Sequence, residues 1–457
     1  MNVSFLSDLM QTVAERGRAL MGLRRPMGAG RAEILRLADD LLSRRGEASG
    51  VAVAGDILAA YDALPPSERR EVLIGFAERF GPNMSRLVEA AKAFTENPGL
   101  ATAGDLHAVS EPRRQELIRR LNLAPGGTPA LVRMREDLLA GGKGSPAVDA
   151  LDRDFVHLFS SWFNRGFLVL RRIDWSTPAN ILEKIIHYEA VHTIADWNEL
   201  RARLDPPDRR LYAFFHPALV DEPLIFVEVA LMNNIPGAIA PVLAAARMPI
   251  AAADARTAVF YSISNTQRGL TGVSFGHFLI KQVVEELKRE LPKLESFVTL
   301  SPIPGFAAWL DRERQDEASI LIGEEDRQAL AALEAPRWHE KPATMEGADR
   351  LLLPLAAHYF LRAKTPDGRP LDPVARFHLG NGARLERLNA MGDASDRALR
   401  QSYGLMANYL YDLDHIEANH EAFADRGEVV ASSAVRRLMR NRPTPVAPVA
   451  SLSLKPA

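Results

Sequence analysis

Residues 261–306 read YSISNTQRGLTGVSFGHFLIKQVVEELKRELPKLESFVTLSPIPGF, and this stretch decides the fold class of the larger part of the chain. It begins inside a run rich in β-branched and aromatic residues, TAVFYSIS at 257–264, which predicts a strand. A second such run, FVTL at 297–300, lies near its end. Between the two runs, apolar residues recur at helical spacing, at Phe275, Phe278, Leu279, Val283, Leu287 and Leu291. The pattern predicts a strand–loop–helix–strand unit inside a mixed sheet.

Further strands are predicted before this unit. The apolar runs LYAFFH at 211–216 and LIFVEVAL at 224–231 are separated by the turn-forming segment 217–223, which indicates adjacent antiparallel strands. After the unit, the pattern at 396–412 predicts a helix. We therefore expect a mixed α/β domain over residues 151–440.

The first 150 residues have a different pattern, that of one helix after another. EILRLADDLLSRR at 33–45 places its apolar residues near helical spacing, and strand-like runs are absent from this part of the sequence. Glycine- and proline-containing breakers separate the predicted helices, at 81–83, 125–127 and 141–146. Residues 1–150 thus predict an all-helical domain suited to self-association, which makes the fold class α+β. The Pro- and Ser-rich tail at 441–457 predicts disorder.

Composition excludes several classes of function. The chain has 457 residues, 47% of them hydrophobic and 25% charged, with a formal net charge of −2, which argues against a general nucleic-acid or membrane-surface binder. No apolar run approaches the ~18 residues of a membrane-spanning helix, and the N-terminus lacks the apolar core of a signal peptide. The absence of cysteine excludes disulfides and thiolate chemistry, and it fits a reducing cytoplasm. His187 and His192 are poorly spaced for metal binding on one helical face, so we expect no metal site.

The loop between the predicted strand and helix, SISNTQRGLTGVSFG at 262–276, is the most chemical stretch of the sequence. Gly269, Gly272 and Gly276 would let the backbone approach a ligand closely. Because a helix N-terminus presents unpaired N–H groups, this position suits a pyrophosphate. The loop is neither a Walker A sequence nor a dinucleotide-binding G-x-G-x-x-G sequence.

Two residues outside the loop stand in unusual strings. Ser301 follows the FVTL run and precedes Pro302, which favours an extended backbone that projects the hydroxyl from the strand end. His378 stands in FHLGNGA, between apolar neighbours. On residue pattern alone, a polar strand-ending serine and a hydrogen-bonded core histidine are the alternatives to a catalytic pair.

The 261–306 block and four other segments resemble the malonyl-CoA decarboxylase family. Those segments are HYEAVHTIADWNELRARL at 187–204, FFHPALVDEPLIFVEVAL at 214–231, FHLGNGARLERLNAMGDAS at 377–395 and YGLMANYLYDL at 403–413. The family places a helical domain before a catalytic domain similar to the acetyltransferase-like (GNAT) fold. Gln267, Arg268 and Gly269 match the start of the usual GNAT phosphate-loop signature, whereas the later glycine spacing departs from it, which argues against an ordinary acetyltransferase.

The resemblance implies the site residues and the reaction. It implies decarboxylation of malonyl-CoA to acetyl-CoA and carbon dioxide, with Ser301 and His378 as the catalytic pair. The chemistry of these residue types leaves the acid and base roles open, and we assign Ser301 as polariser or acceptor and His378 as donor. It also implies that the CoA phosphates are lined by Thr271, Gly272, Val273, Ser274, Phe275, Gly276 and His277. No step of this reaction demands a metal, biotin or redox cofactor, so none is expected, and CoA is part of the substrate.

Two other functions stay open on the sequence. A GNAT-type acyltransferase would use the same acyl-CoA groove with an added acceptor, and a noncatalytic acyl-CoA sensor would bind CoA esters without turnover. The expected ligands are malonyl-CoA and acetyl-CoA, and the expected assembly is a homo-oligomer, a dimer or a tetramer. A preference for malonyl-CoA over methylmalonyl-CoA cannot be predicted, because one methyl group changes binding by only ~1–3 kcal/mol.

Overall fold

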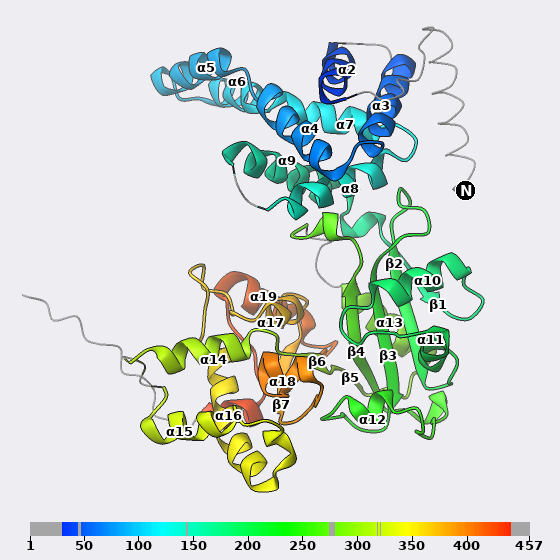
Figure 1. Cartoon of the computed structure of the whole chain (residues 1–457), viewed down its shortest axis with the longest axis vertical. Helices are drawn as coiled ribbons and strands as arrows, with labels where there is room; N and C mark the ends of the chain where they lie inside the picture. The colour runs from blue at the N-terminus through cyan, green and yellow to red at the C-terminus, as the bar shows by residue number, and fades with distance from the viewer. Residues whose placement is uncertain are drawn as a thin grey trace, which may run out of the picture. The chain divides into compact units, whose positions relative to one another are not determined.

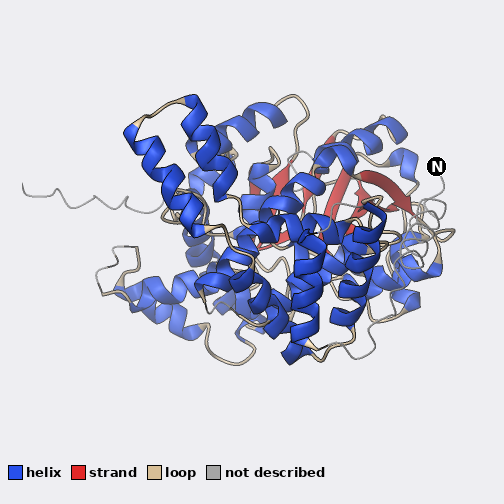
Figure 2. Cartoon of the chain, turned by 90° about the horizontal axis from the view of Figure 1, so that it is seen from above, coloured by secondary structure: helices blue, strands red, loops and turns tan. Residues whose placement is uncertain are grey.

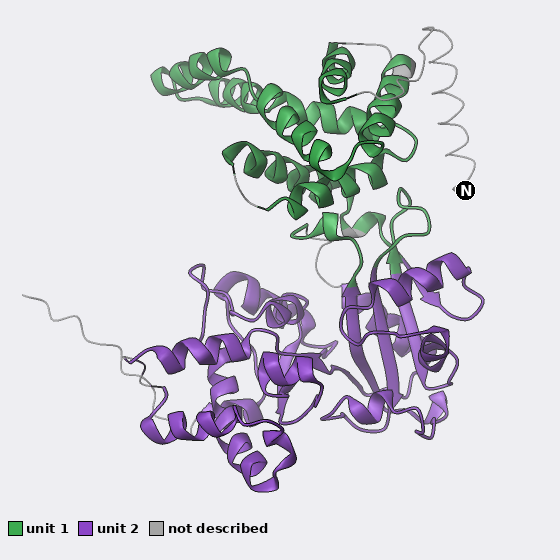
Figure 3. Ribbon diagram, viewed as in Figure 1, with its two compact units in different colours: residues 1–169, 214–224, 265–276 green, residues 170–213, 225–264, 277–457 purple. Residues whose placement is uncertain are grey.

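The computed structural model describes residues 30–43, 47–142, 145–273, 279–317, 319 and 321–439. The chain divides into two compact units, shown in different colours in Figure 3. The first comprises residues 1–169, 214–224 and 265–276, and the second comprises residues 170–213, 225–264 and 277–457. The predicted domain boundaries at 150 and 440 stay predictions, and the predicted tail at 441–457 lies outside the described residues.

The N-terminal region is helical, as predicted (Figure 1). Sequence signals mark several helix ends. Pro66 opens one helix, while the side chains of Asn83 and Ser145 accept hydrogen bonds from backbone N–H groups at the starts of two others. The helices are α2 Arg31–Ser43, α3 Glu47–Asp62, α4 Pro66–Arg79, α5 Met84–Glu96, α6 Leu100–Ser110, α7 Arg113–Asn122, α8 Gly127–Ala140 and α9 Pro146–Trp162.

An eight-stranded mixed sheet follows, which confirms the predicted α+β class. Its strand order is β1-β2-β3-β4-β5-β8-β6, and β7 pairs with β8 off this path. Figure 2 shows the strands in red and the helices in blue. The strands are β1 Val169–Ile173, β2 Arg209–Phe215, β3 Pro223–Met232, β4 Thr257–Asn265, β5 Ser296–Thr299, β6 Ser301–Pro302, β7 Arg384–Asn389 and β8 Met406–Leu410.

The predicted strand–loop–helix–strand unit is present as β4, α13 Leu279–Glu290 and β5. β4 and β5 pair in parallel, with Thr257 opposite Ser296 and Phe260 opposite Thr299. A parallel pair needs a crossover connection, and α13 supplies it. The helix buries Leu279, Val283 and Leu287 of the predicted apolar face, together with Ile280 and Val284. Leu291 lies just beyond the end of the helix, and Phe275 and Phe278 lie outside the described residues.

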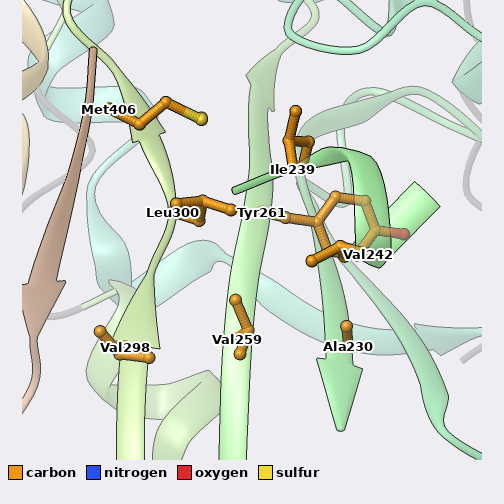
Figure 4. Packing of buried hydrophobic residues seen from close by; sticks show 8 residues of the cluster. All are labelled: Ala230, Ile239, Val242, Val259, Tyr261, Val298, Leu300 and Met406. Atoms are coloured by element: carbon orange, nitrogen blue, oxygen red, sulfur yellow. The ribbon is translucent and has the colours of Figure 1, made fainter. Parts of the chain in front are cut away.

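One face of the sheet is fixed by an apolar cluster drawn from β3, β4, β5, β8 and the short helix α12 Ala240–Leu243 (Figure 4). Val298 and Leu300 both belong to it. Since alternate residues of an extended segment point to opposite faces, Thr299 and Ser301 turn away from this cluster. The cluster comprises Ala230, Ile239, Val242, Val259, Tyr261, Val298, Leu300 and Met406.

The predicted helix at 396–412 is wrong in its second half. The helix α18 Asp396–Ser402 stops at Tyr403 and Gly404, whose φ angles of 54° and 78° are left-handed. The chain then forms β8, buried between β5 and β7. The MANYL sequence is short and apolar, so sheet pairing rather than periodicity decides its structure.

Two helices, α10 Ala179–Tyr188 and α11 Trp197–Leu204, lie between β1 and β2 in the sequence, and the other helices precede or follow β7 and β8. None of the described helices of the chain is long and apolar enough to cross a membrane. These C-terminal helices are α14 Phe306–Gln315, α15 Glu324–Ala332, α16 Pro342–Leu361, α17 Pro373–Gly380, α19 Ile416–Arg426 and α20 Ser433–Met439.

Candidate active site

Ser301 is the first residue of both the SPIPGF motif and the short strand β6, which follows β5 closely in the sequence. It pairs with Ala407 of β8 in antiparallel register, and its side chain is buried. Pro302 continues the same short strand opposite Met406. The pairing with β8 holds the serine backbone in the extended form that the following proline favours.

His378 lies in the last turn of α17. Asp372 caps the start of this helix by accepting a hydrogen bond from the Ala375 N–H, and Pro373 occupies the first turn. The imidazole is buried and stacks on the ring of Tyr409, with ring centroids 4.5 Å apart and an interplanar angle of 27°. Helix cap and aromatic stacking together fix the direction of the imidazole.

The structure brings the two predicted residues together across 77 positions of sequence. Ser301 Oγ lies 3.1 Å from His378 Nε2. On the other side of the ring, His378 Nδ1 lies 2.8 Å from the Tyr411 hydroxyl. The Ser301 hydroxyl also donates to Thr299 Oγ1 across 2.9 Å. The result is a buried string of hydroxyl and imidazole groups on the face of the sheet opposite the apolar cluster.

Burial determines the charge of His378. Desolvation lowers the pKa of this imidazole from its ordinary value of 6.5 to about 3. The ring is therefore neutral at physiological pH, with one nitrogen carrying a hydrogen and the other able to accept one. A neutral, desolvated imidazole can donate a hydrogen bond or a proton to a strongly basic centre such as an enolate.

The predicted phosphate loop is described only in its first part. Thr271 and Gly272 are exposed, whereas Val273 is buried. Gly272 has a φ of +77°, and no atom lies within 4 Å of the position that a Cβ would occupy. Gly269 has another reason to be glycine than ligand approach, because a Cβ there would collide with the backbone carbonyl of Val132 in α8. Ser274, Phe275, Gly276 and His277 lie outside the described residues.

Comparison with known proteins decides the family. Models of the malonyl-CoA decarboxylase N-terminal and C-terminal domains match residues 80–163 and 166–448. The chain belongs to the malonyl-CoA decarboxylase family. The C-terminal model spans both Ser301 and His378, together with the whole predicted phosphate loop.

Individual members of the malonyl-CoA decarboxylase family match over most of the chain. A crystal structure of malonyl-CoA decarboxylase from Rhodopseudomonas palustris is 62% identical, with a TM-score of 0.86, and the match covers 90% of this chain and 100% of that one. The corresponding structure from Agrobacterium vitis is 57% identical with a TM-score of 0.84, covering 89% and 99%. A mitochondrial malonyl-CoA decarboxylase from Anser anser anser is 34% identical, covering 84% of this chain and 82% of the relative.

Sequence reasoning missed three residues of the site in this family member. Thr299 and Tyr411 contact the Ser301–His378 pair, yet in sequence they look like ordinary strand and strand-end residues. Asp372 is fully buried, and its carboxylate accepts a backbone hydrogen bond from Ala375 at the start of α17, the helix that carries His378. The Asp-Pro pair at 372–373 is a helix-start signal that could have identified α17.

One cavity lies elsewhere in the second unit. It has a volume of about 470 Å³ and includes neither Ser301 nor His378. Basic side chains from the ends of α16 and α19 and from α20 contribute to its wall. Its lining residues are Leu361, Arg362, Lys364, Arg426, Gly427, Glu428, Val429, Arg436 and Met439.

Proposed function

We propose that this chain converts malonyl-CoA to acetyl-CoA and carbon dioxide, using Ser301 and His378. The observation that carries the proposal is the buried contact of 3.1 Å between Ser301 Oγ and His378 Nε2. It occurs in a chain that is 62% identical to a protein solved as a malonyl-CoA decarboxylase. A cytoplasmic location stays a prediction.

The reaction needs charge stabilisation and one proton. As the bond between the carboxylate carbon and the α-carbon breaks, its electrons move toward the thioester and leave an enolate, while the carboxylate departs as carbon dioxide. A hydrogen-bond donor directed at the enolate oxygen lowers the barrier. The α-carbon then takes one proton to become the methyl group of acetyl-CoA. His378 supplies this proton and takes up a proton from solvent as the products leave, while Ser301 holds the imidazole in place.

The burial of the pair supports a decarboxylation. Ser301 is 6% exposed and His378 is 3% exposed, so both act in surroundings of low polarity. A malonyl carboxylate brought to such a place loses part of its hydration, which favours the neutral product over the charged reactant. The absence of charge on His378 is compatible with donation, since the α-carbon of an enolate is a far stronger base than imidazole.

The CoA portion is assigned to residues 271–277. In this proposal, backbone N–H groups of the loop and of the following helix hold the phosphates, as helix N-termini generally do. Gly272 supports the assignment, because its exposed backbone is open on the side where a side chain would otherwise stand. The positive φ of Gly272 also restricts the position to glycine or a strained residue.

We also propose self-association through the helical region. In α5 and α6, which are described over their whole length, no residue is buried. Met84 and Val88, one helical turn apart on α5, are 63% and 64% exposed. These two helices pack mainly on each other, so an apolar edge is available to a second copy.

Product analysis tests the function directly. Purified chain is incubated with malonyl-CoA alone, and acetyl-CoA and carbon dioxide are measured by mass spectrometry. We expect equal amounts of both products with no added acceptor. An acyltransferase would need an amine or alcohol for turnover, and an acyl-CoA sensor would leave malonyl-CoA intact, so either outcome would contradict the proposal.

A further inference from the structure

Thr299 is a fully buried threonine whose hydroxyl oxygen accepts two hydrogen bonds. It is the last residue of β5 and is 0% exposed. Its Oγ1 accepts from the Ser301 hydroxyl across 2.9 Å and from the backbone N–H of Tyr409 across 3.1 Å. The backbone N–H of Tyr409 can only donate, so one lone pair of Thr299 Oγ1 always accepts this hydrogen bond.

Counting hydrogens along the string assigns the tautomer of His378. A serine hydroxyl has one hydrogen, and Ser301 gives it to Thr299. The Ser301 oxygen can then meet His378 Nε2 only as an acceptor, so Nε2 carries the imidazole hydrogen. Nδ1 is left to accept from the Tyr411 hydroxyl 2.8 Å away. The hydrogen bonds all run one way, from Tyr411 through His378 and Ser301 to Thr299.

We propose that Thr299 is a positioning residue that holds His378 in the tautomer with its hydrogen on Nε2, the nitrogen that faces Ser301. This inference rests on the proposed decarboxylation, because that hydrogen is the one delivered to the α-carbon. If Thr299 did not take the serine hydrogen, Ser301 could donate to Nε2 instead. The imidazole hydrogen would then move to Nδ1, which faces Tyr411 and not Ser301.

The backbone of Thr299 is held independently of its hydroxyl. Its carbonyl accepts a hydrogen bond of 2.7 Å from the Asn408 amide, and its strand pairs in register with β4, where it lies opposite Phe260. Removing only the hydroxyl therefore keeps these backbone contacts, while it removes the acceptor of both the Ser301 hydroxyl and the Tyr409 N–H. Thr299→Val is nearly isosteric, and Thr299→Ser keeps the hydroxyl, so the two variants form a matched pair.

The test combines steady-state kinetics with nitrogen-15 NMR of labelled histidine. For Thr299→Val we expect kcat to fall by ~100-fold with KM within ~2-fold of wild type, the size of a lost proton-donor step. Thr299→Ser should recover most of kcat. The nitrogen shifts should place the His378 hydrogen on Nε2 in wild type and Thr299→Ser, and on Nδ1 in Thr299→Val.

The possible failures are distinguishable. A wild-type signal with the hydrogen on Nδ1 would mean that Thr299 donates to Ser301, and it would overturn the inference even in an active enzyme. The same holds if Thr299→Val keeps wild-type kcat, or loses activity with its tautomer unchanged. If instead wild-type protein releases no carbon dioxide from malonyl-CoA, the proposed function fails, and the NMR result alone then decides the tautomer.

Discussion

The buried, uncharged state of His378 predicts a loss of stability in mild acid that one substitution should remove. In the unfolded chain this imidazole takes up a proton as the pH falls through 6.5, whereas in the folded protein it does so only near pH 3. Between these values the unfolded state binds more protons, so the free energy of unfolding falls as the pH is lowered. The stability contribution is complete above pH 6.5 and is lost progressively below it.

The size of the effect follows from the two pKa values. Each pH unit well inside this window costs about 1.4 kcal/mol. Between pH 7 and pH 5, a shift from 6.5 to about 3 corresponds to a loss of about 2 kcal/mol from His378 alone. The figure barely depends on the folded pKa, provided that this pKa lies below 4.5 or so. His192, whose pKa burial lowers to about 4, contributes a loss of the same sign.

The assay is urea unfolding at pH 7 and pH 5, followed by tryptophan fluorescence. We expect His378→Gln to lose about 2 kcal/mol less than wild type between the two pH values. Comparing each protein with itself cancels the packing cost of the substitution. Subtracting the loss of the variant from that of wild type also cancels the contribution of Glu228. Burial raises the pKa of this carboxyl group to about 7, so Glu228 stabilises the fold as the pH falls. His415→Gln, whose ring is largely exposed, is the control and should keep the full loss. An equal loss in His378→Gln and wild type would refute the assignment of a neutral buried imidazole.

Three further changes test other parts of the structure. Gly272→Val should weaken CoA binding, measured by calorimetry, by at least ~10-fold, because a side chain would block the approach of the backbone to the ligand. The control is Gly142→Val, at a similar φ of +73° and with equally open surroundings, which should leave CoA affinity unchanged. Arg203→Met should lower the free energy of unfolding by ~3–5 kcal/mol, because it leaves the buried Glu228 carboxylate without its partner at 2.9 Å. A change of less than ~1 kcal/mol would show that the ion pair is not buried in solution. Val88→Asp should reduce the mass found by light scattering if α5 carries the self-association surface, and an unchanged mass would exclude this edge.

Local sequence patterns predicted single helices and strands of this fold, whereas strand pairing decided the elements that have no clear local pattern. The amphipathic stripe of α13 and the β-branched run of β4 are written in neighbouring residues, so the crossover unit could be read directly from the sequence. β8 could not, because five residues carry too little periodicity and Gly404 gave the only break before it. Strand identity there depends on pairing with β5, which lies far earlier in the sequence, and with β7, which is separated from β8 by the helix α18.

The site shows the same division. Ser301 and His378 were singled out by family motifs, but their contact depends on the pairing of β6 with β8 and on the Asp372 cap that sets α17. No local pattern reports such a contact. Thr299 was hidden for a further reason, since threonine is common in strands and only the N–H of Tyr409 reveals what its hydroxyl does. Likewise Gly269 looked like a ligand-binding glycine, and its packing on Val132 gives it a structural reason.

The most direct test of the Ser301–His378 chemistry is the rate of acetyl-CoA formation by His378→Ala at saturating malonyl-CoA. We predict a kcat at least ~100-fold below wild type, the usual scale for losing a general acid, in a protein that still binds CoA with near wild-type affinity. A variant that forms acetyl-CoA at close to the wild-type rate would contradict the role of this imidazole as the proton donor.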